Sequence, residues 1–142
     1  MLSKGIRPDF YCAPILKTEY DRLALVQAAI SGNDKFFLGT DSAPHIHSDK
    51  QSACGCAGIY TAPNTLSCLA HVFEAEFSLH LLEGFTSIHG AAFYGLPQSE
   101  DHITLVKRDA PVTFPARRAT ANGEVEIFDC GVPLYWEVET NL

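Results

Sequence analysis

The first 40 residues combine two short apolar runs with one amphipathic segment, and the connections between them are very short. Residues 10–16 (FYCAPIL) and 35–40 (KFFLGT) are apolar runs of strand length. Between them, Thr18 precedes Asp21 by three residues, a capping-box pattern that starts a helix, and the glycine of residues 31–33 (SGN) is typical of a helix end. A strand, a helix and a second strand joined this tightly predict a parallel βαβ unit and an α/β fold.

The middle of the chain changes from a loop to helices. Residues 42–63 contain glycine and proline but no hydrophobic periodicity, and so long a connection in a compact domain is usually functional or disordered. Helical spacing resumes at residues 64–65, and we expect its buried face to consist of Leu66, Leu69, Phe73 and Phe77. A second short helix is predicted over residues 81–88, ended by Gly90.

The last part of the chain has the pattern of a small β structure. Residues 103–106 (ITLV) and 134–138 (LYWEV) are predicted strands, and several turn-forming segments separate them: Pro111, Pro115, Asn122-Gly123 and residues 131–133. We therefore expect residues 1–100 to form an α/β body and residues 101–142 to form a C-terminal β extension packed on the same domain.

Composition excludes several classes of protein. A chain of 142 residues with 46% hydrophobic residues can bury the core of one domain. The net charge of -7 and the scattered lysines and arginines lack the basic stripe of a nucleic-acid binder. No apolar stretch approaches the roughly 18 residues of a membrane span. Five cysteines, an odd number, without a signal-peptide pattern indicate reduced thiols, so we expect a cytoplasmic protein without nucleic-acid or membrane partners.

Asp41 is the candidate catalytic residue that local sequence offers. It is the first charged residue after the apolar run of residues 35–40, at the carboxyl end of that predicted strand. In β/α barrels this edge is where catalytic side chains project. Without further context, however, an aspartate that caps a helix or loop is the more frequent interpretation.

Four motifs distributed over nearly the whole chain resemble one family. They are YCAPILK at residues 11–17, GTDSAPH at 39–45, CGCAG at 54–58 and FYGLP at 93–97, and Lys50 and Asn64 fit the same pattern. Together they resemble the bacterial-type dihydroorotases of the amidohydrolase superfamily, in their carboxy-terminal portion. The resemblance implies the last βα units of a (β/α)8 TIM barrel of the metal-dependent hydrolase type.

The resemblance also implies roles for four residues. Asp41 would lie at the end of the eighth barrel strand, contact one metal and act as the acid/base that opens or closes a cyclic amide. His45 would contact the carboxylate of the substrate. Ala57 and Ala13 would reach the substrate through their backbone groups, although position 13 is often a larger apolar residue in the family, so that Ala13 alters the shape of the pocket.

The implied cofactor is a binuclear zinc centre, and most of its ligands have no counterpart here. The family pattern needs a His-x-His pair, a carboxylated lysine, two further histidines and the strand-eight aspartate, and only Asp41 matches. Lys17 and Lys35 correspond to other positions of the family. A complete barrel typically takes about 250 residues, so this chain is expected to correspond to its last units and to need an upstream fragment as partner.

Other metal sites are less consistent with the sequence. His45 and His47 form a His-x-His pair that could face one side of an extended segment, but the family's metal-binding pair belongs to the first barrel strand, and we reject this interpretation. Cys54 and Cys56, with Cys12 or Cys68, lack the usual zinc spacing and are expected to be packing residues. We expect the remaining histidines to be surface or core residues: His71, His80, His89 and His102.

Four positions depart from the family pattern. Asp9 stands where a histidine is common, and Gln51 stands where a glutamate is common. His89 and Ala91 replace members of an Asn-Gly-Pro pattern. These departures affect local packing and loop geometry, and they leave Asp41 and the carboxylate-binding histidine unchanged.

The predicted function is a zinc-dependent dihydroorotase, which interconverts N-carbamoyl-L-aspartate and dihydroorotate in de novo pyrimidine biosynthesis, as part of a complete barrel. The alternative is a non-catalytic, truncated remnant that acts as an interaction module. A hydantoin or allantoin ring opener is a third possibility, against which the pair His45 and Ala57 argues. An open barrel edge would expose apolar surface and unpaired backbone, so we also expect a homo-oligomer.

Overall fold

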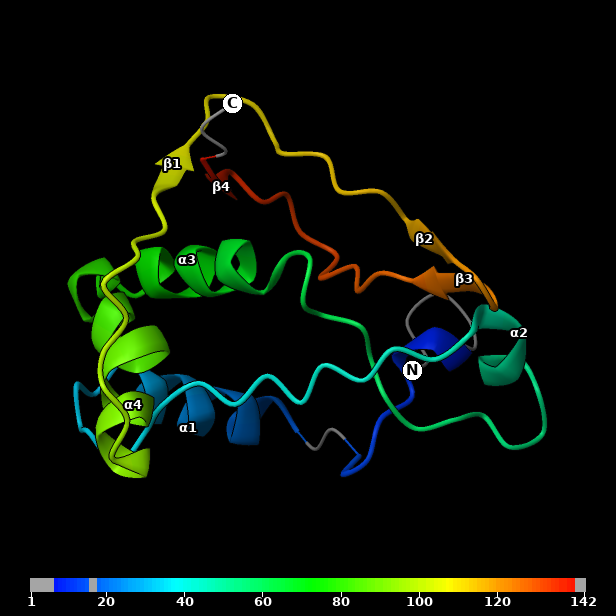
Figure 1. Ribbon diagram of the computed structural model, residues 1–142, viewed down its shortest axis with the longest axis horizontal. Helices are drawn as coiled ribbons and strands as arrows, with labels where there is room; N and C mark the ends of the chain where they lie inside the picture. Colours follow the sequence, from blue (N-terminus) through cyan, green and yellow to red (C-terminus); the bar gives the residue numbers. More distant parts are fainter. Residues whose placement is uncertain (1–6, 16–17, 140–142) are drawn as a thin grey trace. The chain divides into compact units, whose positions relative to one another are not determined.

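The computed structural model describes residues 7–15 and 18–139, and its backbone divides into two compact units (Figure 1). The first unit comprises Met1–Leu16, Thr40–Thr65 and Thr113–Val132. The second unit comprises Lys17–Gly39, Leu66–Val112 and Pro133–Leu142. Each unit is thus assembled from separate stretches of sequence. The division into residues 1–100 and 101–142 stays a prediction.

The second unit begins with helix α1 (Glu19–Ala29), as the sequence predicts. The Thr18 N–H donates to the Asp21 carboxylate at 2.9 Å, and the Asp21 N–H donates to Thr18 Oγ1 at 3.4 Å, which completes the expected capping box. The helix ends just before Gly32, whose φ of 70° is a conformation that glycine adopts without strain. None of the eleven residues of α1 is buried.

The core of the second unit is built on helix α3 (Thr65–Ala75), whose predicted start is confirmed. Ala70 and Phe73 are fully buried and pack with Leu82, and a ring of partly buried residues surrounds them: Ala29, Ile30, Leu69, Leu79, Leu81, Phe85, Leu105 and Trp136. The prediction that Phe77 belongs to the buried face is wrong. The helix ends at Ala75 and the chain turns, so Phe77 has a φ of 55° and is 93% exposed.

Three helical segments follow α3: the 3-10 segment Leu79–Leu81, the π-helical segment Gly84–Ile88 and helix α4 (His89–Tyr94). A helix was predicted over residues 81–88, but the expected break at Gly90 is wrong. Helical structure continues to Gly95, which has a φ of 64°. At Gly90 a Cβ would lie 3.1 Å from the Phe37 ring, so this glycine permits close packing instead of ending the helix.

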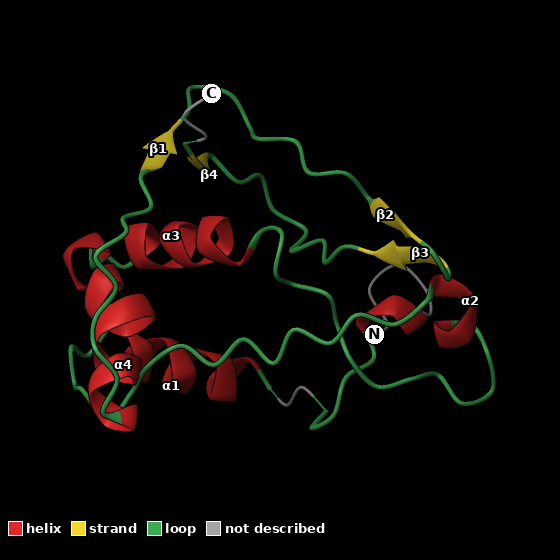
Figure 2. Cartoon of the chain, in the orientation of Figure 1, coloured by secondary structure: helices red, strands yellow, loops and turns green. Residues whose placement is uncertain are grey.

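The two apolar runs do not form the predicted parallel strands. Pro8–Phe10 is a 3-10 helix, and Figure 2 shows residues 11–15 and 35–39 as loop. Leu16 and Lys17 lie outside the described residues. The Leu38 N–H donates to the Phe85 carbonyl at 2.9 Å instead of to a strand. A strand requires a hydrogen-bonded neighbour, and neither run has one within the described part of the chain, so the βαβ ladder is absent there.

Two antiparallel pairs supply the strands of the described residues. In the second unit, β1 (Leu105–Lys107) pairs with β4 (Trp136–Val138), with Val106 opposite Glu137, which confirms the two predicted strand regions. In the first unit, β2 (Arg117–Thr120) pairs with β3 (Gly123–Glu126), and this hairpin was not predicted. Half of its residues are charged and most of them are exposed, so the sequence lacks an apolar strand signal.

The hairpin is attached to the predicted functional loop through short bridges. Ile46 pairs with Val125 and Tyr60 pairs with Ile127, and both partners on the hairpin side are buried. The loop itself contains helix α2 (His47–Lys50) and is otherwise irregular. In the described ranges, no helix has both the length and the apolar character needed to cross a membrane.

Candidate functional site

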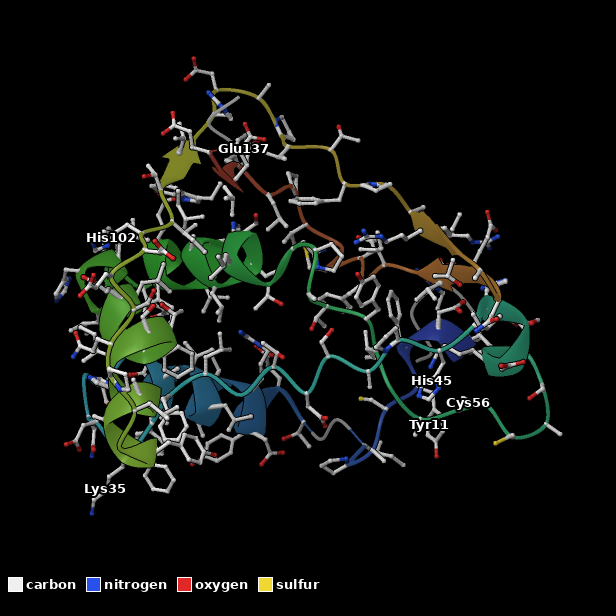
Figure 3. All side chains as sticks on the ribbon, in the orientation of Figure 1. Tyr11, Lys35, His45, Cys56, His102 and Glu137 are labelled. Atoms are coloured by element: carbon white, nitrogen blue, oxygen red, sulfur yellow. The ribbon has the colours of Figure 1, made fainter. Side chains whose placement is uncertain are left out.

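Two segments of the first unit, residues 7–15 and 40–65, contain all four predicted site residues. Backbone hydrogen bonds connect these segments: the Ala43 N–H donates to Ile59 O at 2.9 Å and the Gly58 N–H donates to Tyr11 O at 3.0 Å. The GTDSAPH segment, the CGCAG segment and the start of YCAPILK are therefore neighbours in space, and Figure 3 shows Tyr11, His45 and Cys56 gathered in one region.

His45 and Ala57 are in direct contact. His45 Nε2 lies 3.1 Å from the Ala57 carbonyl oxygen. Because a carbonyl oxygen only accepts, Nε2 carries the hydrogen in this contact, and Nδ1 is the ring nitrogen left for another partner. The Ala57 N–H donates to no group within the described residues. The pair therefore offers one ring nitrogen and one backbone donor.

Gly58 makes the approach of His45 possible. Its φ is 155°, and a Cβ at this position would lie 2.7 Å from His45 Nε2 and 2.8 Å from the Ala43 carbonyl oxygen. Real Cβ atoms do not tolerate such distances, so a side chain here would displace either the imidazole or the backbone. The last glycine of the CGCAG motif is thus required for steric reasons.

Asp41 is exposed, and within the described residues it makes no hydrogen bond. Its φ of 42° lies in the left-handed region, which aspartate tolerates better than most residues. Its carboxylate accepts no hydrogen bond from the described residues, and the residue that precedes α2 is Ile46. Among the described residues, Asp41 therefore caps neither a helix nor a loop, and its carboxylate is available for chemistry.

Ala13 is exposed and lies two residues beyond Tyr11, whose carbonyl oxygen accepts from the Gly58 N–H. The Ala13–Pro14 peptide bond is cis. No hydrogen bond within the described ranges joins Ala13 to Asp41, His45 or Ala57. The roles assigned to these four residues stay predictions.

Lys50 is a buried residue of the site region to which the sequence assigned no role. It ends α2, its exposed fraction is 3%, and its ammonium group contacts three backbone carbonyl oxygens. Lysine is almost never fully buried without partners. Lys50 fits the family pattern, but no local sequence pattern distinguishes a buried lysine from an exposed one. Only the structure therefore reveals that Lys50 is buried.

The cysteines do not form a zinc site among the described residues. Cys54 and Cys56 approach with their Sγ atoms 4.0 Å apart, but no third cysteine, histidine or carboxylate joins them in the described ranges. Burial raises the pKa of the Cys56 thiol, and its hydrogen bond with Cys54 acts in the same direction. A raised pKa disfavours the thiolate that a metal would need.

One cluster of possible ligand groups lies elsewhere in the first unit. Single ligand atoms of Asp9, His47 and Glu126 lie within 4.8 Å of one another. Arg117 already supplies a positive charge there, because its Nε donates to Glu126 at 2.9 Å and a terminal nitrogen lies 3.2 Å from His47 Nε2. Asp9 also accepts from the Gln51 side-chain amide at 3.1 Å, so the two family departures at positions 9 and 51 contact each other.

These contacts test the implied zinc centre. His45 contacts Ala57 whereas His47 contacts Asp9, so the two rings have different partners, and the rejection of a His-x-His metal pair stays a prediction. No group of three or more possible ligands within residues 7–15 and 18–139 includes Asp41. The group of possible ligands found among the described residues therefore does not contain the aspartate that the family resemblance assigns to the metal.

No protein-family model matches the chain. The chain is 59% identical over 138 residues to the dihydroorotase of Rhizobium meliloti. The aligned residues cover 97% of this chain and 40% of that protein. It is 56% identical over 141 residues to the dihydroorotase of Rhizobium etli, covering 99% of this chain and 40% of that protein. The chain spans about 40% of the length of the curated relatives it matches.

Two solved structures are also similar. The dihydroorotase of Saccharomyces cerevisiae in complex with 5-fluoroorotic acid superposes with a TM-score of 0.84 at 35% identity, covering 94% of this chain and 38% of that one. The dihydroorotase of Campylobacter jejuni gives a TM-score of 0.79 at 31% identity, covering 95% and 39%. These matches place the chain, which has mixed helix and strand, among the relatives of hydrolases. It is a homologue of the carboxy-terminal portion of the dihydroorotases, which confirms the resemblance predicted from the motifs.

Proposed function

We propose that this chain supplies the acid/base and substrate-binding part of a dihydroorotase, which interconverts N-carbamoyl-L-aspartate and dihydroorotate in pyrimidine biosynthesis. The supporting observation is that one compact unit contains Asp41, with its carboxylate free of hydrogen bonds within the described residues, together with the contacting pair of His45 and Ala57. A carboxylate that is free in this way can exchange a proton with water and substrate.

The proposed chemistry assigns both proton transfers to Asp41. In ring opening, water adds to the carbonyl carbon of the cyclic amide while Asp41 accepts a proton from that water. As the carbon–nitrogen bond breaks, Asp41 returns the proton to the leaving nitrogen, and the new carboxyl group of the product releases its own proton to water. Ring closure follows the same steps in reverse, with water as the leaving group.

The proposed recognition of the substrate carboxylate uses His45 and Ala57. With Nε2 bonded to Ala57 O, a neutral His45 ring has only an acceptor at Nδ1. A carboxylate also only accepts, so it binds this ring when Nδ1 is protonated, and the Ala57 N–H adds a second donor. This pairing of donors suits an orotate-like ring that carries a carboxylate. It gives a hydantoin or allantoin, which lacks that carboxylate, less to bind.

The zinc dependence of the family requires ligands beyond those described here. We propose that the remaining ligands belong to a completing polypeptide, that the assembled protein is cytoplasmic and that it forms a homo-oligomer. Residues 1–100 would then be the barrel portion and residues 101–142 the β extension. Zinc analysis of the chain, alone and with the polypeptide encoded directly upstream, tests this arrangement.

The proposal is tested by an activity assay of Asp41→Asn. The chain, combined with the polypeptide encoded directly upstream, should convert N-carbamoyl-L-aspartate, and Asp41→Asn should lower turnover by about 10²–10⁴-fold because the proton carrier is lost. The matched control is Asp34→Asn. Like Asp41, Asp34 is an exposed aspartate, but it belongs to the second unit and not to the first. Equal turnover by the Asp41 variant would remove this residue from the mechanism.

A non-catalytic interaction module is the second candidate function, and the exposed apolar residues of the second unit favour it. Phe93, Tyr94 and Leu96 are 69%, 68% and 62% exposed. A metal-free, monodisperse chain that no upstream polypeptide activates would support this alternative. A substrate panel that includes hydantoin and allantoin separates dihydroorotase activity from related ring openings.

A further inference from the structure

The ammonium group of Lys50 is completely used by backbone acceptors. Its Nζ donates to Gly58 O at 2.7 Å, to Cys56 O at 2.8 Å and to Tyr11 O at 3.1 Å. A lysine ammonium has three N–H donors and no acceptor, so the three carbonyl groups match it one to one. None of the three partners is a carboxylate, so the buried charge serves to hold peptide groups and not to form an ion pair.

Two of these carbonyl groups belong to the neighbours of Ala57 in the sequence. Cys56 O lies in the peptide plane before Ala57 and Gly58 O lies in the plane between Gly58 and Ile59, so Nζ holds the two peptide planes on either side of the Ala57–Gly58 peptide. The third carbonyl, Tyr11 O, also accepts from the Gly58 N–H at 3.0 Å and so joins the first segment to the loop. The backbone of Ala57, including the oxygen that contacts His45, is therefore held from both sides.

Opposing effects act on the pKa of Lys50, as expected for a buried ammonium group that is held by carbonyl oxygens. Burial lowers the pKa of Lys50, whereas Asp9, Cys56 and Cys12 act in the opposite direction. A buried charge is tolerated only when hydrogen bonds replace its water shell. Replacing Lys50 by an apolar side chain would leave Cys56 O and Gly58 O without a donor and would leave Tyr11 O with only the Gly58 N–H, and such a loss is more damaging than the removal of an exposed charge.

We propose that Lys50 is a positioning residue that holds the Ala57 backbone and His45 in the geometry that binds the substrate carboxylate. This inference rests on the proposed function, because it assigns the pair His45 and Ala57 to substrate binding. Lys50 itself does not reach the substrate, since all three of its donors are occupied within the protein. Its loss should therefore weaken binding more than it slows the chemical step at Asp41.

The first experiment needs no activity. Amide hydrogen exchange and imidazole NMR spectra of the chain are compared for the unchanged protein, Lys50→Met and Lys35→Met. Lys50→Met should accelerate exchange of the Gly58 amide and change the His45 resonances, because the loop around Ala57 loses its support. Lys35→Met, the same substitution at an exposed lysine of the second unit, should change neither signal.

The second experiment uses the complete enzyme, that is, the chain combined with the polypeptide encoded directly upstream, and introduces Lys50→Arg. A guanidinium is a planar fork and cannot direct its donors at three carbonyl groups that surround one point, while it keeps the charge. We expect KM for N-carbamoyl-L-aspartate to rise about tenfold or more with kcat within about threefold of the unchanged enzyme, since a misplaced binding group weakens ground-state and transition-state binding together.

The outcomes distinguish the two proposals. An unchanged Gly58 exchange rate in Lys50→Met, or an unchanged KM in Lys50→Arg, overturns the role of Lys50. If Lys50→Met does not fold, Lys50→Arg decides alone, and a fall in kcat without a rise in KM contradicts positioning. If the unchanged complete enzyme does not turn over N-carbamoyl-L-aspartate, the proposed function fails, whereas the NMR comparison still reports whether Lys50 positions His45.

Discussion

At the scale of single residues, the close approach around Gly58 makes a steric prediction. In Gly58→Ala the new Cβ would lie 2.7 Å from His45 Nε2 and 2.8 Å from Ala43 O, at a φ of 155°. We expect this substitution to destabilise the first unit by about 1–3 kcal/mol and to break the contact between His45 and Ala57. Urea denaturation measures the first effect, and the His45 NMR resonances report the second.

A matched control separates steric overlap from backbone strain. Gly131 also belongs to the first unit and has a positive φ of 76°, but a Cβ there meets no atom within 4 Å. Gly131→Ala should therefore cost only the strain of its backbone conformation and leave the His45 resonances unchanged. If both variants lose the same stability and neither moves the His45 resonances, the overlap at Gly58 is not what shapes the site.

The residues of the candidate site could be predicted from motifs, but not the way in which they are held. Asp41, His45 and Ala57 lie in short, specific sequence patterns, so their identification needs no knowledge of the fold. The support from Lys50 depends on carbonyl groups at residues 11, 56 and 58, and its bond to residue 11 crosses 39 positions of sequence. No local pattern encodes which carbonyl groups will meet a lysine.

At the scale of elements, Glu74 joins α3 to both strands of the β1–β4 pair. Its carboxylate accepts from Lys107 Nζ at 2.7 Å and from Trp136 Nε1 at 3.1 Å. The hydrogen bond from Lys107, followed by the one from Trp136, lowers the pKa of Glu74 below its ordinary value of 4.5. Protonation of Glu74 therefore weakens both contacts.

The pH dependence follows from the sign of this shift. A carboxyl group whose pKa is lower in the folded state contributes stability above its unfolded pKa of 4.5 and loses it as the pH falls through the folded value. Because Trp136 is the single tryptophan, its fluorescence should report loosening of the contact as the pH falls below about 4.5. Glu74→Gln should show the loosened signal already at neutral pH and respond less to acid.

Glu83→Gln is the control for this titration, because it removes another exposed carboxylate of the second unit. Its acid response should match that of the unchanged chain. A Glu74→Gln variant with an unaltered fluorescence profile would show that other carboxyl groups cause the acid transition.

Elements with a local signal could be predicted, and elements defined by a distant partner could not. The capping box at Thr18 and the apolar spacing of α3 lie within one turn or one helix, and both helices are found where expected. The runs at residues 10–16 and 35–40 have the composition of strands, but a strand forms only where another strand supplies hydrogen bonds. The β2–β3 hairpin has such a partner and forms in spite of its polar sequence.

At the scale of the whole molecule, the second unit exposes several large apolar side chains. The rings of Phe37, Phe93 and Tyr94 pack against one another with centroid distances of 5.0–5.9 Å, yet Phe93 and Tyr94 remain largely exposed. On helix α1, Tyr20 and Leu25 are 81% and 71% exposed. Contiguous exposed apolar groups usually mark an interaction surface or lead to association.

This surface predicts that the isolated chain associates with itself. Sedimentation velocity over a range of protein concentrations should show an average mass that rises with concentration. The double substitution Phe93→Ser and Leu96→Ser should shift this association to about 30-fold higher concentration, because it removes two exposed apolar side chains, each of which contributes on the order of 1 kcal/mol when buried. Val132→Ser, at a 48% exposed position of the first unit, should have no effect.

The same variants also show whether a second copy of the chain or a completing polypeptide binds the surface formed by Phe93, Tyr94 and Leu96. If the polypeptide encoded directly upstream covers Phe93 and Leu96, its addition should abolish self-association of the unchanged chain, and the double variant should bind it more weakly. If a second copy covers them, self-association should persist after the addition. A chain that stays monomeric at every concentration, with or without the upstream polypeptide, contradicts both, because its exposed rings would then need no partner.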